Sequence, residues 1–436
     1  MNARFGLVFC AVLALGTPAA ADAPEPGTIT EFRVPSATGD LLGITAGPDG
    51  NLWFTDYEAN QIGRITPAGT ITEYPIPTAN SGAKAITAGP DGNVWFTEGW
   101  ANQIGRITPG GVFTEFTIPT AGSEPAGITT GPDGNLWFTE YFANEIGRLT
   151  PGGAFAEFAL PNQNSGPAGI TAGPDGNLWF TENGGNRIGR ITPGGAITEF
   201  PLPYRCCVPD NEPLGITAGP DGNLWFTEQW ANRIGRITTN GTITDYLIPS
   251  YSSGPAGITA GPDGNLWFTE NYIDANRIGR ITPAGEISEF PLPVKDSWPG
   301  AITAGPDGNV WFTERRHIGR IIPGGTPRAV KKTCPVYADP HTPIPKKLGN
   351  RTLTDEITTS TYSCTLRKPV VLCRPLAATT AGEKAFCSAT VGKRGRVRVK
   401  TGRQAVRVTV IARAKPKHDF ADGWQANTWR KTWVLR

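Results

Sequence analysis

Two titratable side chains near the end of the repeated part of the sequence could perform acid–base chemistry. His317 is one of three histidines in the chain, and Glu314 lies three residues before it. An imidazole gains and loses a proton near neutral pH, and a neighbouring carboxylate can orient it or hold a metal ion. We therefore predict His317 as a general base assisted by Glu314. The alternative is that His317 is an ordinary surface residue on a short loop.

A second candidate group consists of aromatic and charged residues that interrupt a regular repeat. An aromatic rim with a few charges suits a flat or ring-containing ligand. Each side chain could instead cover the sheet beside it, so the prediction of a shared pocket depends on their recurrence at equivalent positions. The predicted ligand-binding residues are Tyr57, Lys84, Trp100, Tyr141, Phe142, Trp230, Tyr272, Trp298 and Arg316.

The elements that position these residues come from a repeat of 42 to 46 residues. The sequence Gly-Pro-Asp-Gly-Asn-[Leu/Val]-Trp-Phe-Thr begins at Gly47, Gly89, Gly131, Gly173, Gly219, Gly261 and Gly305. Such a period is typical of helical solenoids or of propellers with four-stranded blades. The repeat lacks a helical apolar pattern and is rich in strand formers, which excludes helical repeats. We predict an all-β chain with a seven-bladed β-propeller over residues 27–325.

Each repeat is predicted to form four strands, named A to D from the centre of the ring outward. In the first repeat they are residues 43–46, 52–55, 62–66 and 70–77. Pro and Gly in the Pro-Asp-Gly segment at 48–50 form the turn between A and B. The prolines of strand D fit only at a sheet edge. Strand D is therefore the outermost strand.

The number of D segments predicts how the ring closes. A D-like segment at residues 27–35 precedes the first A–B–C set, and the seventh set has no D segment after it. The N-terminal strand is therefore expected to complete the last blade. This closure removes a free sheet edge that would be prone to aggregation.

Variation in loop length indicates which face of the ring binds a ligand. In a four-stranded meander the B–C and D–A connections emerge on one face, and the A–B and C–D turns emerge on the other. Extra residues near 204–207 and 271–274 and a shortened loop near 314–317 all fall on the first face. Such variation marks the binding face of repeat proteins. The candidate residues are predicted to lie on it.

Residues that recur in the repeats are predicted to maintain the fold. The tryptophan of each repeated Trp-Phe-Thr segment is predicted to pack as a wedge between neighbouring blades. An acidic set and an arginine set are predicted to form repeating ion pairs or bonds to backbone, with a metal-binding acidic rim as the alternative. Recurrent asparagines are predicted to fix a loop. The acidic set is Asp56, Glu98, Glu140, Glu182, Glu228, Glu270 and Glu314; the arginine set is Arg64, Arg106, Arg148, Arg190, Arg236, Arg280 and Arg320; the asparagines are Asn60, Asn102, Asn144, Asn186, Asn232 and Asn276.

Composition also indicates what the residues before and after the predicted propeller form. Residues 1–21 contain a basic residue, a short apolar run and three alanines, as in a secretory signal peptide. Residues 326–332 are predicted to be a linker and residues 333–436 a small, basic β-sandwich-like domain. From residue 326 onward there are 23 Lys and Arg against 6 Asp and Glu, or +17, which leaves 17 against 32, or −15, for the rest.

These features predict where the protein acts. No later apolar run reaches the roughly 20 residues that span a bilayer, so we expect a secreted or cell-envelope monomer. The basic domain could hold an anionic surface or be merely solvated. Its cysteines, Cys334, Cys364, Cys373 and Cys387, are expected to form disulfides of open pairing. The adjacent Cys206 and Cys207 allow a vicinal disulfide, free thiols or other links.

The repeats resemble the virginiamycin B lyase, or streptogramin lyase, family over about residues 27–325. Recurring Gly-Ile-Thr-x-Gly-Pro-Asp-Gly-Asn-Leu-Trp-Phe-Thr-Glu and Ala-Asn-x-Ile-Gly-Arg-Ile-Thr segments carry the resemblance. It implies a seven-bladed propeller and a lyase that opens cyclic depsipeptide esters with a histidine, a glutamate and Mg²⁺. The family histidine lies just before strand A, where this chain has Leu42, Lys84, Ala126, Ala168, Leu214, Ala256 and Gly300. The family glutamate corresponds to Glu314 or Arg315.

Two functions follow from these observations. As a binding protein, the chain would hold an extracellular small molecule, glycan or cell-wall polymer on its aromatic face. As an enzyme, it would be a Mg²⁺-dependent carbon–oxygen lyase that uses His317 or a metal-bound water as base. The missing histidine at all seven strand A positions favours binding. Phosphate-binding loops, metalloprotease helices and serine elbows are absent from the repeats.

Overall fold

The computed structural model describes residues 25–203, 211–250, 252–272 and 275–324 with their side chains, and the backbone of strands between residues 332 and 435. The signal peptide predicted at 1–21, linker residues 326–331, the insertion with Cys206 and Cys207, and all cysteine side chains lie outside the described part. The chain divides into two compact units, Met1–Arg328 and Ala329–Arg436. Each is described separately.

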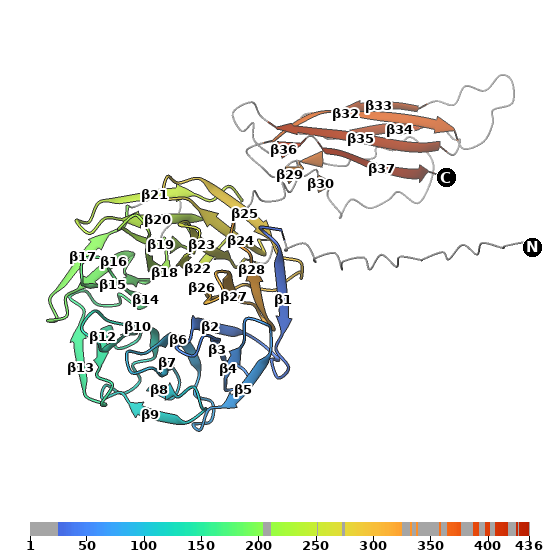
Figure 1. The fold of residues 1–436 in the computed structure, drawn as a ribbon. Coiled ribbons are helices and arrows are strands. Elements are labelled where there is room, and N and C mark those ends of the chain that lie inside the picture. The colour runs from blue at the N-terminus through green and yellow to red at the C-terminus, as the bar shows by residue number, and fades with distance from the viewer. Residues whose placement is uncertain are drawn as a thin grey trace, which may run out of the picture. The chain divides into compact units, whose positions relative to one another are not determined.

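The first unit is a ring of seven antiparallel four-stranded sheets around a central axis (Figure 1). In six of the sheets the strands follow chain order from the centre outward, and in the seventh β1 is the outermost strand, so the predicted propeller is confirmed. Blades 1 to 3 comprise β2 Leu41–Ala46, β3 Leu52–Asp56, β4 Gln61–Ile65, β5 Ile71–Pro75, β6 Ala83–Ala88, β7 Val94–Glu98, β8 Gln103–Ile107, β9 Phe113–Thr117, β10 Pro125–Thr130, β11 Leu136–Glu140, β12 Glu145–Leu149 and β13 Phe155–Ala159.

Blades 4 to 6 repeat this arrangement. They comprise β14 Pro167–Ala172, β15 Leu178–Glu182, β16 Arg187–Ile191, β17 Ile197–Pro201, β18 Pro213–Ala218, β19 Leu224–Glu228, β20 Arg233–Ile237, β21 Ile243–Leu247, β22 Pro255–Ala260, β23 Leu266–Glu270, β24 Arg277–Ile281 and β25 Ile287–Pro291. In the first blade the predicted strands match the observed ones to within two residues at every end.

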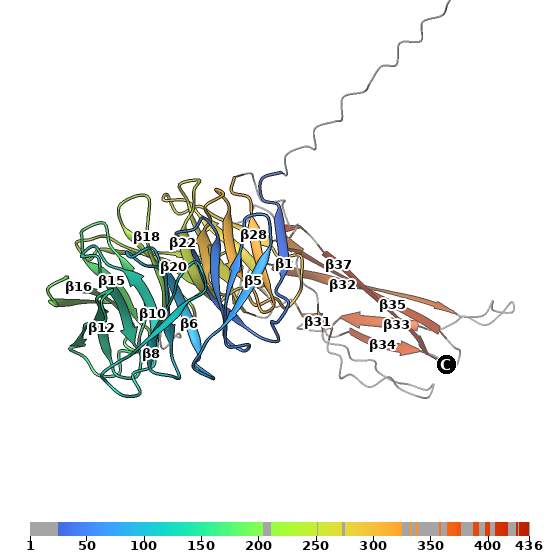
Figure 2. The same ribbon diagram turned by 60° about the horizontal axis from the view of Figure 1, so that its bottom comes forward.

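Blade 7 is completed by the N-terminal strand, as the count of D segments predicted. Its strands are β26 Ile302–Ala304, β27 Val310–Thr313, β28 His317–Ile321 and β1 Ile29–Arg33. β1 pairs with β28 from Ile29 opposite Ile321 to Arg33 opposite His317. Figures 1 and 2 show these two strands side by side, although nearly the whole propeller separates them in sequence. The ring therefore has no open edge between its first and last blades.

The space between blades is filled by one repeated group of side chains. In blade 1 the fully buried Trp53 stacks on Tyr74 of strand D, with ring centroids 5.7 Å apart, and the Arg64 guanidinium lies 5.6 Å from the Trp53 ring. The indole Nε1 donates to Asp49 of the A–B turn at 3.0 Å. All seven landmark tryptophans have no exposed surface, which confirms their prediction as wedges: Trp53, Trp95, Trp137, Trp179, Trp225, Trp267 and Trp311.

A ring of threonine hydroxyls links neighbouring blades near the axis. In blade 1, Thr55 Oγ1 accepts from the backbone NH of Gly43 and donates to the carbonyl of Lys84 in blade 2, both at 2.8 Å. The same relay occurs in every blade, and Thr313 closes it by donating to Leu42 O at 3.2 Å. Buried backbone groups at the inner strands are thereby satisfied.

The second unit contains strands whose arrangement is described by backbone alone. The largest sheet has the order β32-β35-β37, and β33 pairs with β34 as a hairpin. The strands are β29 Lys332–Thr333, β30 Tyr337–Ala338, β31 Ile357–Thr358, β32 Cys364–Pro375, β33 Cys387–Val391, β34 Val397–Thr401, β35 Val406–Pro416, β36 Trp424–Gln425 and β37 Asn427–Leu435. The β-sandwich stays a prediction. Among the described residues, none forms a helix with the length and hydrophobicity to cross a bilayer.

Candidate functional site

The two faces of the ring are built from different connections. The B–C loops bond to the D–A connections: the amide of Trp100 donates to Ser81 O at 3.0 Å, and that of Arg315 donates to Ser297 O at 2.7 Å. The A–B and C–D turns meet at the other end of the blades, where Arg64 Nη1 donates to Pro109 O at 3.3 Å. We call the first side the loop face and the second the turn face.

Large aromatic side chains are exposed on the loop face. Trp100, Phe142 and Trp230 lie in B–C loops with exposed fractions of 62%, 71% and 54%, and Trp298 lies in a D–A connection with 39%. Tyr57 meets Trp100 edge to face with centroids 5.0 Å apart, and Tyr141 meets Phe142 in the same way at 5.4 Å. The loops of blades 1, 2, 3 and 5 therefore present apolar ring surface to solvent.

Glycines in the D–A connections seat some of these rings. Gly82 has φ of +68°, and a Cβ added to it would come within 2.9 Å of Trp100. Gly254 has φ of +56°, and its Cβ would come within 2.4 Å of Tyr272. A side chain at either glycine would meet both backbone strain and a collision with the ring. These glycines fix where Trp100 and Tyr272 lie.

Three non-glycine residues adopt the left-handed conformation at the equivalent position, and two of them, Glu124 and Glu212, were not singled out from the sequence. Glu124, Glu212 and Trp298 have φ of 50°, 47° and 50°. A left-handed conformation costs a non-glycine residue about 1–2 kcal/mol, and such outliers cluster at ligand sites. Aligning the residue before strand A across the repeats would have found Glu124 and Glu212, because Gly82, Gly166 and Gly254 stand at the same position.

An ion pair lies next to the aromatic residues of blades 1 and 2. Lys84 is in strand β6, and its Nζ contacts Glu124 Oε1. Both side chains are about three-quarters buried. Burial and the charges of Glu58 and Glu124 raise the pKa of Tyr57. Lys84 and Glu124 therefore place one positive and one negative group beside Tyr57 and Trp100.

Below the loop face, each blade buries the carboxyl group that ends strand B. Glu98, Glu140 and Glu314 have no exposed surface, and burial is the main cause that raises the pKa of each to about 8. Each is also repelled by a strand D carboxylate, and contact with a serine hydroxyl partly offsets this. Burial raises the pKa of Glu182 to about 7. Glu98, Glu140 and Glu314 are therefore mostly protonated at neutral pH, and Glu182 is partly so.

The predicted pairing of the acidic and arginine sets is wrong. In six of the seven blades the arginine pairs instead with the aspartate of the A–B turn, as in Arg64 with Asp49 at 3.6 Å and Arg106 with Asp91 at 3.5 Å. The ladder explains why, because Trp53 lies opposite Arg64 whereas Asp56 lies opposite Gln61. The alternative of a bond to backbone holds at Asp56, which accepts from Ala59 N at 3.0 Å.

The recurrent asparagines fix the D–A connections, as predicted. Asn60 has φ of 56°, donates to Thr78 O at 3.0 Å and accepts from Ser81 N at 2.8 Å. Blade 7 has Arg316 in place of the asparagine, and its guanidinium donates to Thr38 O at 2.8 and 3.1 Å. Arg316, a predicted ligand-binding residue, therefore makes a loop contact of the kind that asparagine makes elsewhere.

The predicted acid–base residues lie in blade 7. Glu314 N donates to His317 O at 2.9 Å, and His317 begins strand C opposite Arg33. His317 is half-buried, and this burial lowers its pKa despite the opposing effect of Glu31. His317 is therefore neutral at pH 7 and able to accept a proton, whereas Glu314 is protonated. His317 lies in the third strand from the axis, not among the inner strands.

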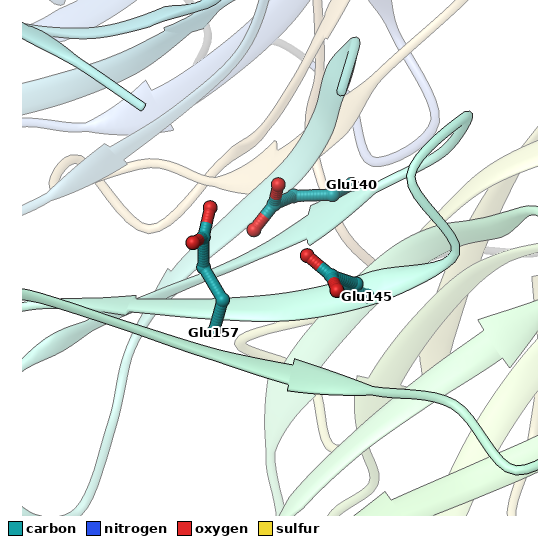
Figure 3. A group of neighbouring side chains, drawn as sticks. All are labelled: Glu140, Glu145 and Glu157. Carbon is teal, nitrogen blue, oxygen red and sulfur yellow. The ribbon is translucent and has the colours of Figure 1, made fainter. Parts of the chain in front are cut away.

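Blade 3 holds a group of residues with the chemistry of a metal site. Glu140, Glu145 and Glu157 each offer a carboxylate oxygen, and these oxygens lie within 4.8 Å of one another (Figure 3). Oxygen ligands of this kind suit hard divalent cations. None of the strand C or strand D residues of this group was singled out from the sequence.

Comparison with known proteins identifies relatives of the ring. The model of the virginiamycin B lyase family matches residues 21–211 and 204–335. A solved streptogramin B lyase is 44% identical with a TM-score of 0.64, covering 67% of this chain and 96% of that one. Virginiamycin B lyase from Staphylococcus aureus is 45% identical with a TM-score of 0.64, covering 68% of this chain and 99% of that one.

A catalytically inactive histidine-to-alanine variant of the Staphylococcus aureus enzyme, solved with quinupristin, matches with the same identity and TM-score. No match was found among curated protein sequences. The matched residues span the ring whose blades, closure and inter-blade wedges are described above. The chain belongs to the virginiamycin B lyase family.

Proposed function

We propose that the ring binds a small cyclic or polymeric ligand on its loop face. The observation that carries this proposal is the set of exposed aromatic side chains at equivalent loops, with Phe142 at 71% and Trp100 at 62% exposure. Exposed apolar surface of this kind is typical of interaction sites. Aromatic side chains supply large contact area at low entropic cost, which makes them frequent anchors of binding energy.

The ligand class follows from the charges beside the rings and from the relatives. Lys84 and Glu124 offer a donor and an acceptor next to Tyr57 and Trp100. This combination suits a ligand with both rings and amides, as in a cyclic depsipeptide. Quinupristin, present in the structure of a Staphylococcus aureus relative, is therefore the first ligand to test. Glycans and cell-wall polymers are the other members of the proposed class.

A lyase is the second candidate function, supported by the protonation states in blade 7. A neutral His317 could take a proton from the carbon next to the ester-bearing carbon. The electrons of that C–H bond would then form a C=C double bond as the ester C–O bond breaks and the carboxylate departs with the electron pair of that bond. Glu314, His317 and Glu31 do not form a group with ligand atoms within 4.8 Å among the described residues. These residues therefore do not fit Mg²⁺ as they stand.

Incubation of a streptogramin B with the purified protein separates the two functions. Mass spectrometry should show intact ligand, and titration calorimetry should show binding that Trp100→Ala and Trp230→Ala weaken by at least about tenfold each. Val112→Ala is the matched control, because Val112 is 65% exposed in a turn on the other face. Linearised product would support the lyase, and its loss in His317→Ala would assign the base. Absence of both binding and product would reject the cyclic depsipeptide.

We also propose that the protein acts outside the cytoplasm as a monomer. The predicted signal peptide at 1–21 and the +17 charge from residue 326 onward support export and attachment to an anionic surface. Co-sedimentation of the full chain with anionic vesicles should decrease as salt rises. Equal sedimentation with neutral and anionic vesicles would contradict this attachment.

A further inference from the structure

Blade 3 differs from the other six blades at the first residue of strand C. In blades 4 and 6 an arginine there approaches the buried strand B carboxylate, with Arg187 3.6 Å from Glu182 and Arg277 3.8 Å from Glu270. Blade 3 has a third carboxylate at this position, where the other blades have a glutamine, an arginine or a histidine. The seven residues are Gln61, Gln103, Glu145, Arg187, Arg233, Arg277 and His317.

The ladder of blade 3 brings three carboxylates to one face of the sheet. Glu140 of β11 lies directly opposite Glu145 of β12, and Glu157 of β13 lies opposite Gly147. Gly147 is two residues from Glu145 and has no side chain, so Glu157 can reach diagonally toward the other two. Figure 3 shows the three carboxylates directed at a common space, and their nearest oxygens lie within 4.8 Å.

The carboxylates of this group lack a basic side chain as partner among the described residues. Glu140 has no exposed surface, and neither of its carboxylate oxygens accepts a hydrogen bond. The nearby Ser123 hydroxyl donates to Asn102 Oδ1 at 2.9 Å instead. Glu157 accepts one bond, from Thr120 N at 3.1 Å, and no ion pair joins any of the three to a described Lys, Arg or His. When Glu140 is ionised, its buried charge requires a counter-charge that no described basic side chain supplies.

We propose that Glu140, Glu145 and Glu157 bind a calcium ion. Ca²⁺ takes oxygen ligands at 2.3–2.6 Å, so two oxygens on one ion are at most about 4.6–5.2 Å apart. The separation of up to 4.8 Å falls in this range. The ion supplies the positive charge that arginine supplies in blades 4 and 6. It is a site distinct from His317 and Glu314, which lie in blade 7.

The ion has a structural consequence for the loop face. Glu140 ends strand β11 and Glu145 begins strand β12, so the loop between them carries Tyr141 and Phe142. Binding of one ion to both ends of this loop, and to β13 through Glu157, ties three strands together where the loop emerges. Calcium thereby orders the loop with the most exposed aromatic side chain of the described residues.

Calorimetry with calcium chloride on the chelator-treated full chain tests the proposal. The wild-type protein should bind calcium at blade 3, and calcium should raise its Tm by mass action. Glu145→Gln gives blade 3 the residue of blade 2 and should weaken binding by at least about tenfold, because one ligand charge is lost. Glu145→Arg gives it the residue of blades 4 to 6 and should abolish the calcium response while the Tm without calcium stays at or above that of wild type.

Blade 2 provides the matched control. Gln103→Glu adds the missing carboxylate beside Glu98 and Glu115, so it should add one further equivalent of calcium. Should wild type show no calcium-dependent heat or Tm shift, or should Glu145→Arg retain the wild-type response, the site is absent. If Mg²⁺ gave the same heat and the same Tm shift as Ca²⁺, the assignment of the site to calcium would be wrong.

Discussion

The turn face and the loop face of the ring use the same strands but differ in how far they repeat. On the turn face every described blade has the same aspartate bonded to its tryptophan indole at 2.9–3.0 Å. On the loop face the residue before strand A changes from Gly82 to Glu124 to Trp298, and the exposed residues change with it. Uniform contacts therefore maintain the blades, and departures from uniformity mark the face on which we propose that a ligand binds.

Deletion of β1 should break the ring most severely. The strand supplies five ladder pairs to β28, and Phe32 stacks on Trp311 with centroids 5.5 Å apart. Without residues 28–35, blade 7 has an open edge and Trp311 loses its cover. Thermal melting should show a much lower Tm, and light scattering should show aggregation. Unchanged melting and solubility would mean that the ring does not depend on this closure.

A pair of tryptophans in blade 5 tests the comparison directly. Trp225 has no exposed surface and Trp230 is 54% exposed. Trp225→Ala should lower the free energy of unfolding by about 3–5 kcal/mol because it leaves a cavity between blades. Trp230→Ala should change it by less than about 0.5 kcal/mol. Denaturant unfolding measures both, and similar losses in the two variants would remove the distinction between the faces.

Stability should fall as pH rises from about 5 to about 8.5. The pKa is about 8 for Glu98 and Glu314 and about 7 for Glu182, compared with the ordinary 4.5. The folded ring therefore holds more protons than the unfolded chain in this range, and ionisation of these carboxyls opposes folding. Their stabilising contribution is complete below the unfolded pKa and lost as pH passes through the folded pKa. Tm recorded across this range measures the effect.

Glu98→Gln supplies the control for that experiment, because glutamine stays neutral at the same position. This variant should show a shallower decrease of Tm with pH than wild type. A slope equal to that of wild type would assign the pH dependence to other groups. All three carboxyls lie beneath the loop face. The result therefore also separates the pH dependence of Tm that comes from the loop face from that of the turn face.

A small effect on stability, in the stabilising direction if any, is expected from Glu124→Gly. Glycine relieves the φ of 50° at this position, and loss of the pair with Lys84 removes about 0–1 kcal/mol. The free energy of unfolding should therefore stay the same or rise by up to about 1 kcal/mol, while affinity for a loop-face ligand falls. Denaturant unfolding and calorimetry on one preparation test both. A variant that lost stability and kept its affinity would reverse the role assigned to Glu124.

Much of the fold could be predicted because it rests on local patterns. The seven landmarks fixed the blade number, and the unpaired D segment at 27–35 fixed the partner of β28. The pairing of Arg64 could not be predicted from sequence alone, because it depends on register. Trp53 lies opposite Arg64, and this places the guanidinium over the indole and near Asp49.

The candidate site was less accessible to sequence reasoning. Exposed aromatic residues stood out by type, as at Trp100 and Trp230, and the structure places both on the loop face. Glu124 and Glu212 were missed because only the structure shows that this position has a left-handed backbone conformation, which makes a departure from glycine significant. The carboxylates of blade 3 were missed because Glu145 and Glu157 come together only through the ladder of β12 and β13.

The threonine relay has a consequence for how such a ring can change in length. Each hydroxyl accepts from its own blade and donates to the following one, so all seven bonds run in one sense around the axis. A duplication or loss of one whole unit preserves a donor and an acceptor at every junction. A duplication of half a unit would leave both the donor and the acceptor at a junction without a hydrogen-bond partner. Gene rearrangements that respect the repeat boundary are therefore the ones that this architecture tolerates.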